Sequence, residues 1–337
     1  MTARLLTVDP ARPDPDALAE AGAVLRAGGL VAFPTETVYG LGAYALDEAA
    51  VRRIFAAKGR PSFNPLIAHV ADIAGARALA AEWPPLAQAL AERFWPGPLT
   101  LVLPKRPIVP DAVTAGRASV ALRVPAHPVA RALIAAAGIP LAAPSANRFT
   151  ELSPVTAQQV ARGLGDRVDV ILDGGRTSVG IESTVVDLTT SPPTLLRPGT
   201  ITRAALEAVT GPLASPAEPE DEEAPRAAPG MIARHYAPRA VVRLLDGDDF
   251  ADAVAAAADR DAPVGAVTWS PLAAMSAALL DAHHRLPAEA VAYAARLYDT
   301  LHALDDAGCR EVLVERPPEG AEWDGVRDRL TRAAHPA

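Results

Sequence analysis

The sequence is poor in cysteine, in aromatic residues and in basic charge. Cys309 is the single cysteine among 337 residues, so neither an intrachain disulfide nor a zinc site built from several thiolates can form. This usage is typical of a reducing cytoplasm, and we expect Cys309 to be a small buried residue that opens a strand. Aromatic residues make up 4% of the chain and hydrophobic residues 50%, which predicts a core of small aliphatic side chains. The net charge of -8 argues against a protein that coats nucleic acid through a broad basic surface.

Long apolar segments and the common catalytic motifs are also missing. No segment reaches the roughly 20 apolar residues of a membrane span, and the first residues lack the apolar run of a signal peptide. We therefore expect a soluble, cytoplasmic protein without a membrane partner. The sequence contains no GxxxxGK[ST] phosphate loop, no GxGxxG fingerprint, no GxSxG elbow and no HExxH helix. A nucleotide, if bound, must be held by a less common architecture.

Short apolar runs alternate with helical patterns over residues 1–211 and predict one layered α/β domain. A helix is expected from Asp47, which can cap it, to residue 57, with Gly59 behind it. A second helix is expected to start at Pro128 and to end at Gly138. Strands are expected at 30–33, 66–70, 99–103, 120–124, 168–172 and 184–188.

The composition of the sequence changes after residue 211. Residues 212–230 contain five prolines and five acidic residues against one arginine, which predicts a flexible, self-repelling linker that we extend to residue 238. In residues 239–337, AVVRLLDGD, VGAVTWS and CREVLVERPP resemble strands, and helical patterns occur at 249–259, 288–306 and 322–334. This order predicts a smaller, doubly wound α/β domain.

The stretch FPTETVYGLG at residues 33–42 follows an apolar strand with three hydroxyls, a carboxylate and two glycines. Such a surface suits a polar ligand, although an elaborate loop would have the same composition.

The stretch AAKGRPSFNPLIAHV places Lys58 and Arg60 around a Gly-Pro break, followed by Asn64 and His69. An arginine fork and a compact lysine charge suit polyphosphate or carboxylate recognition. A positive helix C-terminus that opposes the macrodipole would show the same pattern. His69 lies in an apolar strand, where a histidine is either a ligand or a hydrogen-bonded core residue.

Further polar residues follow other predicted strands. Arg123 lies deep in a strand and needs an anionic partner, either a protein carboxylate or a ligand. Ser145, Asn147 and Ser153 follow a small-residue strand that ends in Pro144, at the kind of position where α/β sheets bind ligands, although a capped turn is the alternative. The remaining candidate segments are the glycine-rich stretch before Ser183, the Arg197-Pro-Gly turn, and PGMIARHYAP at residues 229–238, which could act as a latch.

Taken together and in order, these strings resemble the threonylcarbamoyl-AMP synthase family, whose catalytic unit is the YrdC-like domain. The resemblance rests on FPTETVYGLG, KGRP with NPLIAHV, FWPGPLTLVL, VALRVPAHP, APSAN, GIESTVVD and LRPG, which lie between residues 20 and 211. PGMIARHYAP and the α/β domain behind it resemble the long form of the family. The resemblance implies a YrdC-like twisted-sheet α/β domain, a linker and a Rossmann-like C-terminal domain.

The family resemblance also implies a reaction, in which L-threonine, bicarbonate and ATP give threonylcarbamoyl-AMP and pyrophosphate. This is the first step toward threonylcarbamoyladenosine in tRNA, so a hand-off to the tRNA threonylcarbamoyl transferase complex is expected. A magnesium ion is expected on the ATP phosphates, and no metal is expected on protein side chains. Binding of double-stranded RNA or tRNA would be weak.

The resemblance assigns roles by position. Lys58 and Arg60 are the expected catalytic residues. The expected ATP-binding residues are Lys58, Arg60, Asn64, Ser119, Ser145, Asn147, Ser153, Arg197 and Tyr236. The expected L-threonine-binding residues are Thr37, His69, Arg123, Ala143 through its main chain, and Ser183. Thr150 stands where the family pattern leads us to expect a glycine.

The resemblance also gives the stretch FPTETVYGLG a role as the floor of the threonine site. With Thr37 in contact with the substrate, we expect Thr35, Glu36 and Tyr39 to shape the wall of the pocket. We expect the two glycines of the stretch to let the chain turn closely beneath it.

Two alternatives stay open on the residues alone. The first is an RNA-binding module with Lys58 and Arg60 on a basic patch, against which the acidic total argues because such binding depends on counterion release. The second is a carbamoyl transferase of the hydrogenase-maturation type. That family adds a zinc-finger module, which one cysteine cannot build.

Overall fold

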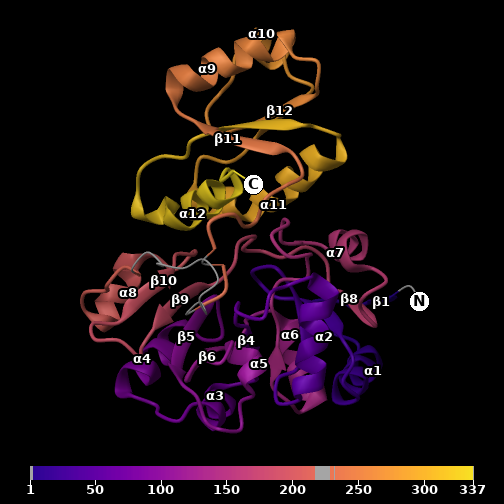
Figure 1. The fold of residues 1–337 in the computed structure, drawn as a ribbon, viewed down its shortest axis with the longest axis vertical. Helices are drawn as coiled ribbons and strands as arrows, with labels where there is room; N and C mark the ends of the chain where they lie inside the picture. Colours follow the sequence, from indigo (N-terminus) through magenta and orange to yellow (C-terminus); the bar gives the residue numbers. More distant parts are fainter. Residues whose placement is uncertain (1–2, 217–227, 231, 337) are drawn as a thin grey trace. The chain divides into compact units, whose positions relative to one another are not determined.

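The computed structural model describes residues 3–216, 228–230 and 232–336, which fold as two compact units (Figure 1). The first unit comprises Met1–Phe149, Pro154–Ser178 and Glu182–Met231, and the second comprises Thr150–Ser153, Val179–Ile181 and Ile232–Ala337. Two short segments from inside the range 1–211 therefore belong to the second unit. Residues 217–227 and 231 of the predicted flexible linker lie outside the described residues.

The first unit is built on a twisted, mixed sheet of ten strands. The strands are β1 Arg4–Thr7, β2 Val31–Pro34, β3 Tyr39–Tyr44, β4 Ile67–His69, β5 Leu99–Pro104, β6 Ser119–Arg123, β7 Leu141–Ala142, β8 Val170–Asp173, β9 Thr184–Asp187 and β10 Thr194–Arg197. They lie in the order β1-β8-β2-β3-β7-β4-β6-β5-β9-β10. All six predicted strands are present, with ends shifted by at most two residues. Strands β1, β3 and β10 were not predicted.

Helices of the first unit begin or end at capping residues in several cases. They are α1 Pro15–Arg26, α2 Glu48–Lys58, α3 Ile73–Leu79, α4 Pro85–Phe94, α5 Asp111–Thr114, α6 Pro128–Ala137, α7 Ala157–Leu164 and α8 Arg203–Thr210. The Asp47 carboxylate accepts hydrogen bonds from the first free N–H groups of α2, and Gly59 ends that helix with a φ of 65°. Gly138, with a φ of 66°, ends α6 in the same way. Both predicted helices are confirmed.

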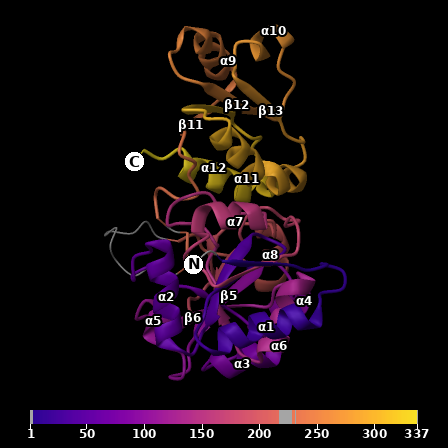
Figure 2. The ribbon, with the colours of Figure 1, turned by 90° about the vertical axis from the view of Figure 1, so that its right-hand side faces the viewer.

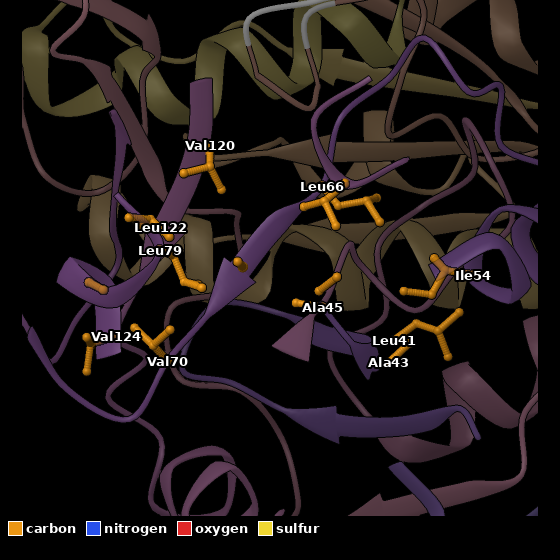
Figure 3. Packing of buried hydrophobic residues seen from close by; sticks show 14 of the residues in the cluster. Leu41, Ala43, Ala45, Ile54, Leu66, Val70, Leu79, Val120, Leu122 and Val124 are labelled. Atoms are coloured by element: carbon orange, nitrogen blue, oxygen red, sulfur yellow. The ribbon is translucent and has the colours of Figure 1, made fainter. Parts of the chain in front are cut away.

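One face of the sheet supports the main apolar core. Leu41 and Ala43 of β3 lie opposite Ile54 of α2, and Leu122 of β6 belongs to the same cluster (Figure 3). Each large aliphatic side chain that is fully buried stabilises the fold by about 1.5–3 kcal/mol. On the opposite face, α1 and α6 cover β2 and β8 through a second apolar cluster.

The stretch FPTETVYGLG forms the β2–β3 hairpin, and this corrects the expected role of its glycines. Gly40 and Gly42 lie within β3, where the chain is extended and does not turn. A Cβ atom on Gly42 would lie 2.8 Å from the ring of Phe33 on the paired strand. The glycine is therefore needed to make room for an aromatic ring.

The second unit has a parallel four-stranded sheet in the order β11-β14-β12-β13. Its strands are β11 Val241–Leu245, β12 Val264–Thr268, β13 Ala282–Arg285 and β14 Glu311–Glu315, and its helices are α9 Gly247–Ala255, α10 Ala274–Ala277, α11 Ala290–Asp306 and α12 Asp324–Ala333, with short 3₁₀ turns at Ala256–Asp259 and Ala321–Trp323. Helices α9 and α10 lie on one side of this sheet, and α11 and α12 lie on the other (Figures 1 and 2). The predicted doubly wound domain is confirmed.

Two smaller expectations can also be compared with the structure. Cys309 is buried and lies two residues before β14, close to its expected place at the start of a strand. Among the described residues, no helix combines the length and the apolar character that crossing a membrane requires.

Candidate functional site

Several predicted site residues share the face of the sheet that lies opposite the main core. Side chains alternate along a strand, so Ser119, Ala121 and Arg123 of β6 point to the same side. His69 of β4 pairs with Arg123 in register and therefore points the same way. Thr100 of β5 lies on the same face, because Val102, two residues further along β5, pairs with Ala121. The sequence predicted His69 and Arg123 within strands, and the structure brings them together on one face of the sheet.

Arg123 has a protein carboxylate as its partner. Its Nη2 donates to Glu36 Oε1 over 2.7 Å and to Thr37 Oγ1 over 3.0 Å, and its Nε lies 3.3 Å from the Gly97 carbonyl. The Glu36 and Arg123 side chains are 8% and 4% exposed, so the ion pair is buried. The question left open by the sequence, a carboxylate or a ligand, is answered for this structure by Glu36.

Glu36 is the functional candidate whose contact the sequence did not reveal. Burial alone would raise the pKa of its carboxyl, but the charge and the hydrogen bond of Arg123, together with the main-chain N–H of Ala126, outweigh burial and lower the pKa. Glu36 therefore stays ionised and fixes the guanidinium. Its neighbours along the chain gave no sign of a partner almost 90 residues away.

The two threonines of the β2–β3 turn have different contacts. The Thr35 hydroxyl donates to the Val38 carbonyl over 2.6 Å and accepts from the Thr37 and Val38 main-chain N–H groups, so it closes the turn. The Thr37 hydroxyl lies 2.8 Å from that of Thr35 and accepts from Arg123. Of the two threonines, Thr37 is therefore the one that contacts the arginine.

His69 is buried and electrically neutral. Burial and the nearby charge of Arg123 lower its pKa to about 3. Its Nδ1 lies 3.3 Å from the Ile67 carbonyl, and its ring meets Phe33 edge-on with the centroids 6.4 Å apart. Next to it, the main-chain N–H of Ala143 donates to the Ile67 carbonyl over 2.9 Å. A histidine in this state can exchange hydrogen bonds with a polar ligand but carries no charge.

Lys58 joins α2 to the loop that follows β7. Its Nζ donates to the main-chain carbonyls of Ser145 and Asn147 over 2.6 Å and 2.5 Å, and it lies 3.3 Å from Asn147 Oδ1. The Asn147 amide donates in turn to the Arg148 carbonyl over 2.8 Å. Lys58, Ser145 and Asn147 were predicted from segments nearly 90 residues apart, and the structure brings them together.

Arg60 is hydrogen-bonded to the main chain of its own loop, which follows α2. Its Nε donates to the Asn64 carbonyl over 3.1 Å, its Nη2 donates to the Pro65 carbonyl over 2.8 Å, and its guanidinium lies 5.9 Å from the ring centroid of Phe149. The Asn64 side chain is fully buried, yet neither its amide nitrogen nor its oxygen has a partner among the described residues. A buried amide without hydrogen bonds is costly, so Asn64 has the character of a ligand-binding residue.

Ser183 and Arg197 form a third contact group. Arg197 donates to the Ser183 carbonyl from Nε over 3.0 Å and to the Ser183 hydroxyl from Nη2 over 3.1 Å. The Ser183 hydroxyl also lies 2.8 Å from that of Thr100, which places it on the same face as Arg123. Arg197 Nη1 donates to the Pro229 carbonyl over 3.1 Å, so the start of the PGMIARHYAP string contacts this group.

Gly199 allows this third group to form. A Cβ atom at this position would lie 2.7 Å from both the nitrogen and the hydroxyl of Thr184. The Pro-Gly turn after Arg197 thus brings two backbone segments into close contact, which only glycine permits.

Ser153 and Tyr236 belong to the second unit. Ser153 is fully buried, and its carbonyl lies 3.2 Å from Nε2 of His302. The Tyr236 ring contacts His235, Tyr298 and the guanidinium of Arg329. The predicted site residues are thus divided between the two units, with Ser153 and Tyr236 in the second and all others in the first.

The described residues offer no metal site on the protein. Among them, no group of three or more His, Cys, Asp or Glu side chains could hold a metal ion. Lys58 contacts an amide side chain, and the Ser183 hydroxyl contacts a hydroxyl and a guanidinium group, none of which is the carboxylate that magnesium prefers. Magnesium therefore does not fit these residues as a protein-held ion.

Two family models together cover most of the chain. The model described as "Telomere recombination" matches residues 23–199, and the model described as "Threonylcarbamoyl-AMP synthase, C-terminal domain" matches residues 201–335. The boundary between the two matches falls just after the third contact group.

Relatives and solved structures agree with the family models. The threonylcarbamoyl-AMP synthase of Bacillus subtilis is 42% identical over 94% of this chain and 92% of its own, and that of Pyrococcus abyssi is 52% identical over 67% of each. The structure of P. abyssi Sua5 complexed with L-threonine matches with a TM-score of 0.91 and 40% identity, over 98% of this chain and 97% of that chain. A variant of the same Sua5, in which a histidine and the tyrosine after it are replaced by alanine, matches equally well, with a TM-score of 0.91.

A YrdC-like twisted sheet joined to a Rossmann-like unit defines the chain as a two-domain α/β protein of the long form. Within that class, the chain belongs to the threonylcarbamoyl-AMP synthase family. The family resemblance, the fold class and the enzyme prediction made from the sequence are confirmed, and neither alternative is favoured.

Proposed function

We propose that this protein synthesises threonylcarbamoyl-AMP from L-threonine, bicarbonate and ATP on the polar face of its first sheet. The observation that carries the proposal is the buried group of Arg123, Glu36 and Thr37, in a chain 40% identical to a structure that contains L-threonine. The face supplies cations, hydroxyls and amides in a setting from which water is largely excluded. Such a setting strengthens the electrostatic interactions that orient charged substrates.

On the threonine side, Arg123 binds the substrate carboxylate. Glu36 and Thr37 occupy both hydrogens of Nη2, and Nη1 has no acceptor among the described residues. The carboxylate therefore approaches Nη1, while Glu36 keeps the guanidinium in place. Thr37, the Ser183 hydroxyl and the Ala143 main chain orient the rest of the amino acid, and neutral His69 accepts or donates one hydrogen bond without adding charge.

On the ATP side, three cations act on the phosphates, helped by neutral groups. Lys58 is the last residue of α2, Arg60 lies in the loop behind it, and Arg197 is the last residue of β10. The Asn64 amide gains its missing partners from the nucleotide, which removes the cost of leaving it unpaired. Further hydrogen bonds come from Ser119, Ser145, Asn147, Ser153 and Tyr236.

The reaction needs no nucleophile from the protein. The threonine amine adds to carbon dioxide, which bicarbonate supplies by losing hydroxide, and the product is a carbamate once the amine has lost a proton. A carbamate oxygen then bonds to the α-phosphorus of ATP as the bond to the leaving pyrophosphate breaks. The protein accelerates these steps by holding the reactants in line and by placing cations where charge develops. Magnesium that accompanies ATP would take its ligands from the phosphates.

We propose that residues 1–211 form the catalytic domain and that residues 212–238 form a linker that acts as a lid. Residues 239–337 form the C-terminal α/β domain. Tyr236 covers the nucleotide and excludes water from the labile adenylate. Because the adenylate hydrolyses readily, it passes on to a tRNA threonylcarbamoyl transferase in the cytoplasm.

The test is pyrophosphate release from ATP by the purified full chain, with threonine and bicarbonate omitted in turn. Release should require both substrates, and the product should carry carbon from labelled bicarbonate. Pyrophosphate release that ignores both omissions would overturn the proposal. Salt-sensitive tRNA binding without adenylate formation would instead favour the RNA-binding alternative.

A further inference from the structure

The chain segment before β11 is tied to the second unit at several points. Arg332 Nη1 donates to the Ile232 carbonyl over 2.5 Å, and the Ala237 N–H donates to the Thr150 carbonyl over 3.0 Å. Asp305 accepts from the main-chain N–H groups of Arg239 and Ala240 over 3.0 Å and 3.2 Å. The segment 232–240 is therefore shaped by α11, α12 and the short strand-like segment at 150–151.

Tyr236 has an unusual backbone conformation within this segment. Its φ is +59°, in the left-handed region that a bulky residue seldom adopts. A residue stays in such a conformation only where its surroundings hold it there. Its ring is 1% exposed and lies against the rings of His235 and Tyr298, with centroids 4.0 Å and 6.1 Å away.

The charged neighbour of this ring is Arg329 on α12. Its guanidinium lies 5.1 Å from the centroid of the Tyr236 ring, and the residue is 1% exposed. Asp328 accepts from Arg329 over 2.6 Å and from Arg332 over 3.0 Å, so one carboxylate links the arginine under the ring to the arginine that holds Ile232. A buried cation is expensive to keep, and an apolar side chain would pack in its place at a lower cost. The charge therefore has a use other than packing.

We propose that Arg329 is a positioning residue for the reaction. It acts through Tyr236 by fixing the ring with a cation–π contact, while Asp328 and Arg332 hold the backbone at Ile232. Helix α12 thus sets the geometry of Tyr236, the residue proposed to retain ATP. This inference rests on the proposed contact between Tyr236 and the nucleotide.

The experiment compares Arg329→Met, Arg329→Lys and Arg327→Met in the full chain. Arg327 is a matched control, since it lies on the same helix and pairs with Asp324 over 2.6 Å. Arg329→Met should raise the KM for ATP about tenfold and leave the KM for threonine unchanged, because a desolvated cation–π contact is lost. Arg329→Lys keeps a cation and should show a smaller rise, and the control should match the unaltered protein.

A double variant separates positioning from general stability. In a Tyr236→Ala background, Arg329→Met should produce no further rise in the KM for ATP, because its target is already gone. Independent, multiplying effects would overturn the inference, as would a lower Tm with an unchanged KM. If Arg329→Met does not fold, Arg329→Lys and its double variant carry the same comparison.

The outcomes also distinguish this inference from the function on which it rests. A protein that releases no threonine-dependent pyrophosphate, in its unaltered form and as the Arg327 control, would overturn the proposed function. Tyr236→Ala with an unchanged KM for ATP would overturn both the lid and its positioning. A raised KM in Tyr236→Ala together with an unaffected Arg329→Met would reject the positioning role alone.

Discussion

The two sheets of this protein treat polar side chains differently. In the first unit, Thr100, His69 and Arg123 are nearly or completely buried on a sheet face, where Thr100 contacts Ser183 and Arg123 contacts Thr37. In the second unit, the central strand β14 is apolar in its interior and polar at both ends, and β12 is polar only at Thr268, its last residue. Buried polar groups cost stability unless they are satisfied, so their concentration in one sheet marks that sheet as the working surface.

The polar ends of the second sheet serve its own loops instead. The Glu315 carboxylate accepts from the main-chain N–H groups of Trp269 and Ser270 over 2.9 Å and 3.0 Å. Arg316 pairs with Asp246 over 2.7 Å, with both side chains substantially exposed. The comparison shows that position in a strand does not by itself identify a site residue. A polar strand residue becomes a site candidate when its side chain is buried and also contacts other buried polar side chains.

The largest effect should come from breaking the buried ion pair. Glu36→Ala leaves the Arg123 charge buried without its carboxylate and should lower the free energy of unfolding by about 3–5 kcal/mol. In the second unit, Arg316→Ala removes a solvent-exposed pair and should cost about 0–1 kcal/mol. Urea unfolding of both variants measures the difference.

A double variant sharpens this result. Glu36→Ala combined with Arg123→Met should be more stable than Glu36→Ala alone, because no unpaired charge remains buried. Equal, small losses in Glu36→Ala and Arg316→Ala would show that the two sheets do not differ in the way described.

The next largest effect concerns activity. Arg60→Ala should lower kcat/KM by about 10²–10³, the usual cost of removing a group that stabilises developing charge. Arg243→Ala, on β11 of the second sheet, removes a cation that pairs with Glu311 and should leave kcat/KM unchanged. Circular dichroism and Tm provide the control, since Arg60 also holds the carbonyls of Asn64 and Pro65. Lost folding, with activity lost only in proportion, would make Arg60 a structural residue.

Much of the fold could be predicted because its signals are local. The caps Asp47, Gly59 and Gly138 act on neighbouring residues, and the apolar runs mark the buried strands. Thr150 is another case of a local signal. A glycine was expected at this position, and the residue has a φ of 68°, in the left-handed region that favours glycine. Strand β3 was missed because its glycines looked like turn residues, while the space they leave is needed by Phe33 on the neighbouring strand.

The site was less predictable from the residues because its contacts are distant in the sequence. Arg123 signalled that it needed an anion, but only the folded hairpin brings Glu36 to it. In the same way, Lys58 reaches Ser145 and Asn147 through the pairing of β3 with β7, which no local pattern encodes. The family resemblance proposed these residues as a set, and the geometry supplies the physical reason why several of them act together.

The smallest effect, a dependence of stability on pH, tests the same contrast in burial. The pKa of His69 is lowered to about 3 by burial and by Arg123, against an ordinary value of 6.5 in the unfolded chain. Between those values only the unfolded state binds the proton, so stability is complete above pH 6.5 and falls as the pH decreases. His69→Asn should remove up to about 1.4 kcal/mol per pH unit from this slope. Glu36, whose pKa is also lowered, contributes in the same direction only at more acid pH.

The second sheet again provides the comparison. Burial and the neighbouring His284 and Arg285 lower the pKa of His283 on β13, but this side chain is only partly buried, and solvent screens its interactions. His283→Asn should therefore change the slope less than His69→Asn does, in urea unfolding measured from pH 4.5 to 7. Since His69 stays neutral throughout that range, it should add no inflection near pH 6.5 to kcat/KM for threonine. An inflection that disappears in His69→Asn would mean that the histidine titrates, and the first sheet would then be more hydrated than its buried contacts indicate.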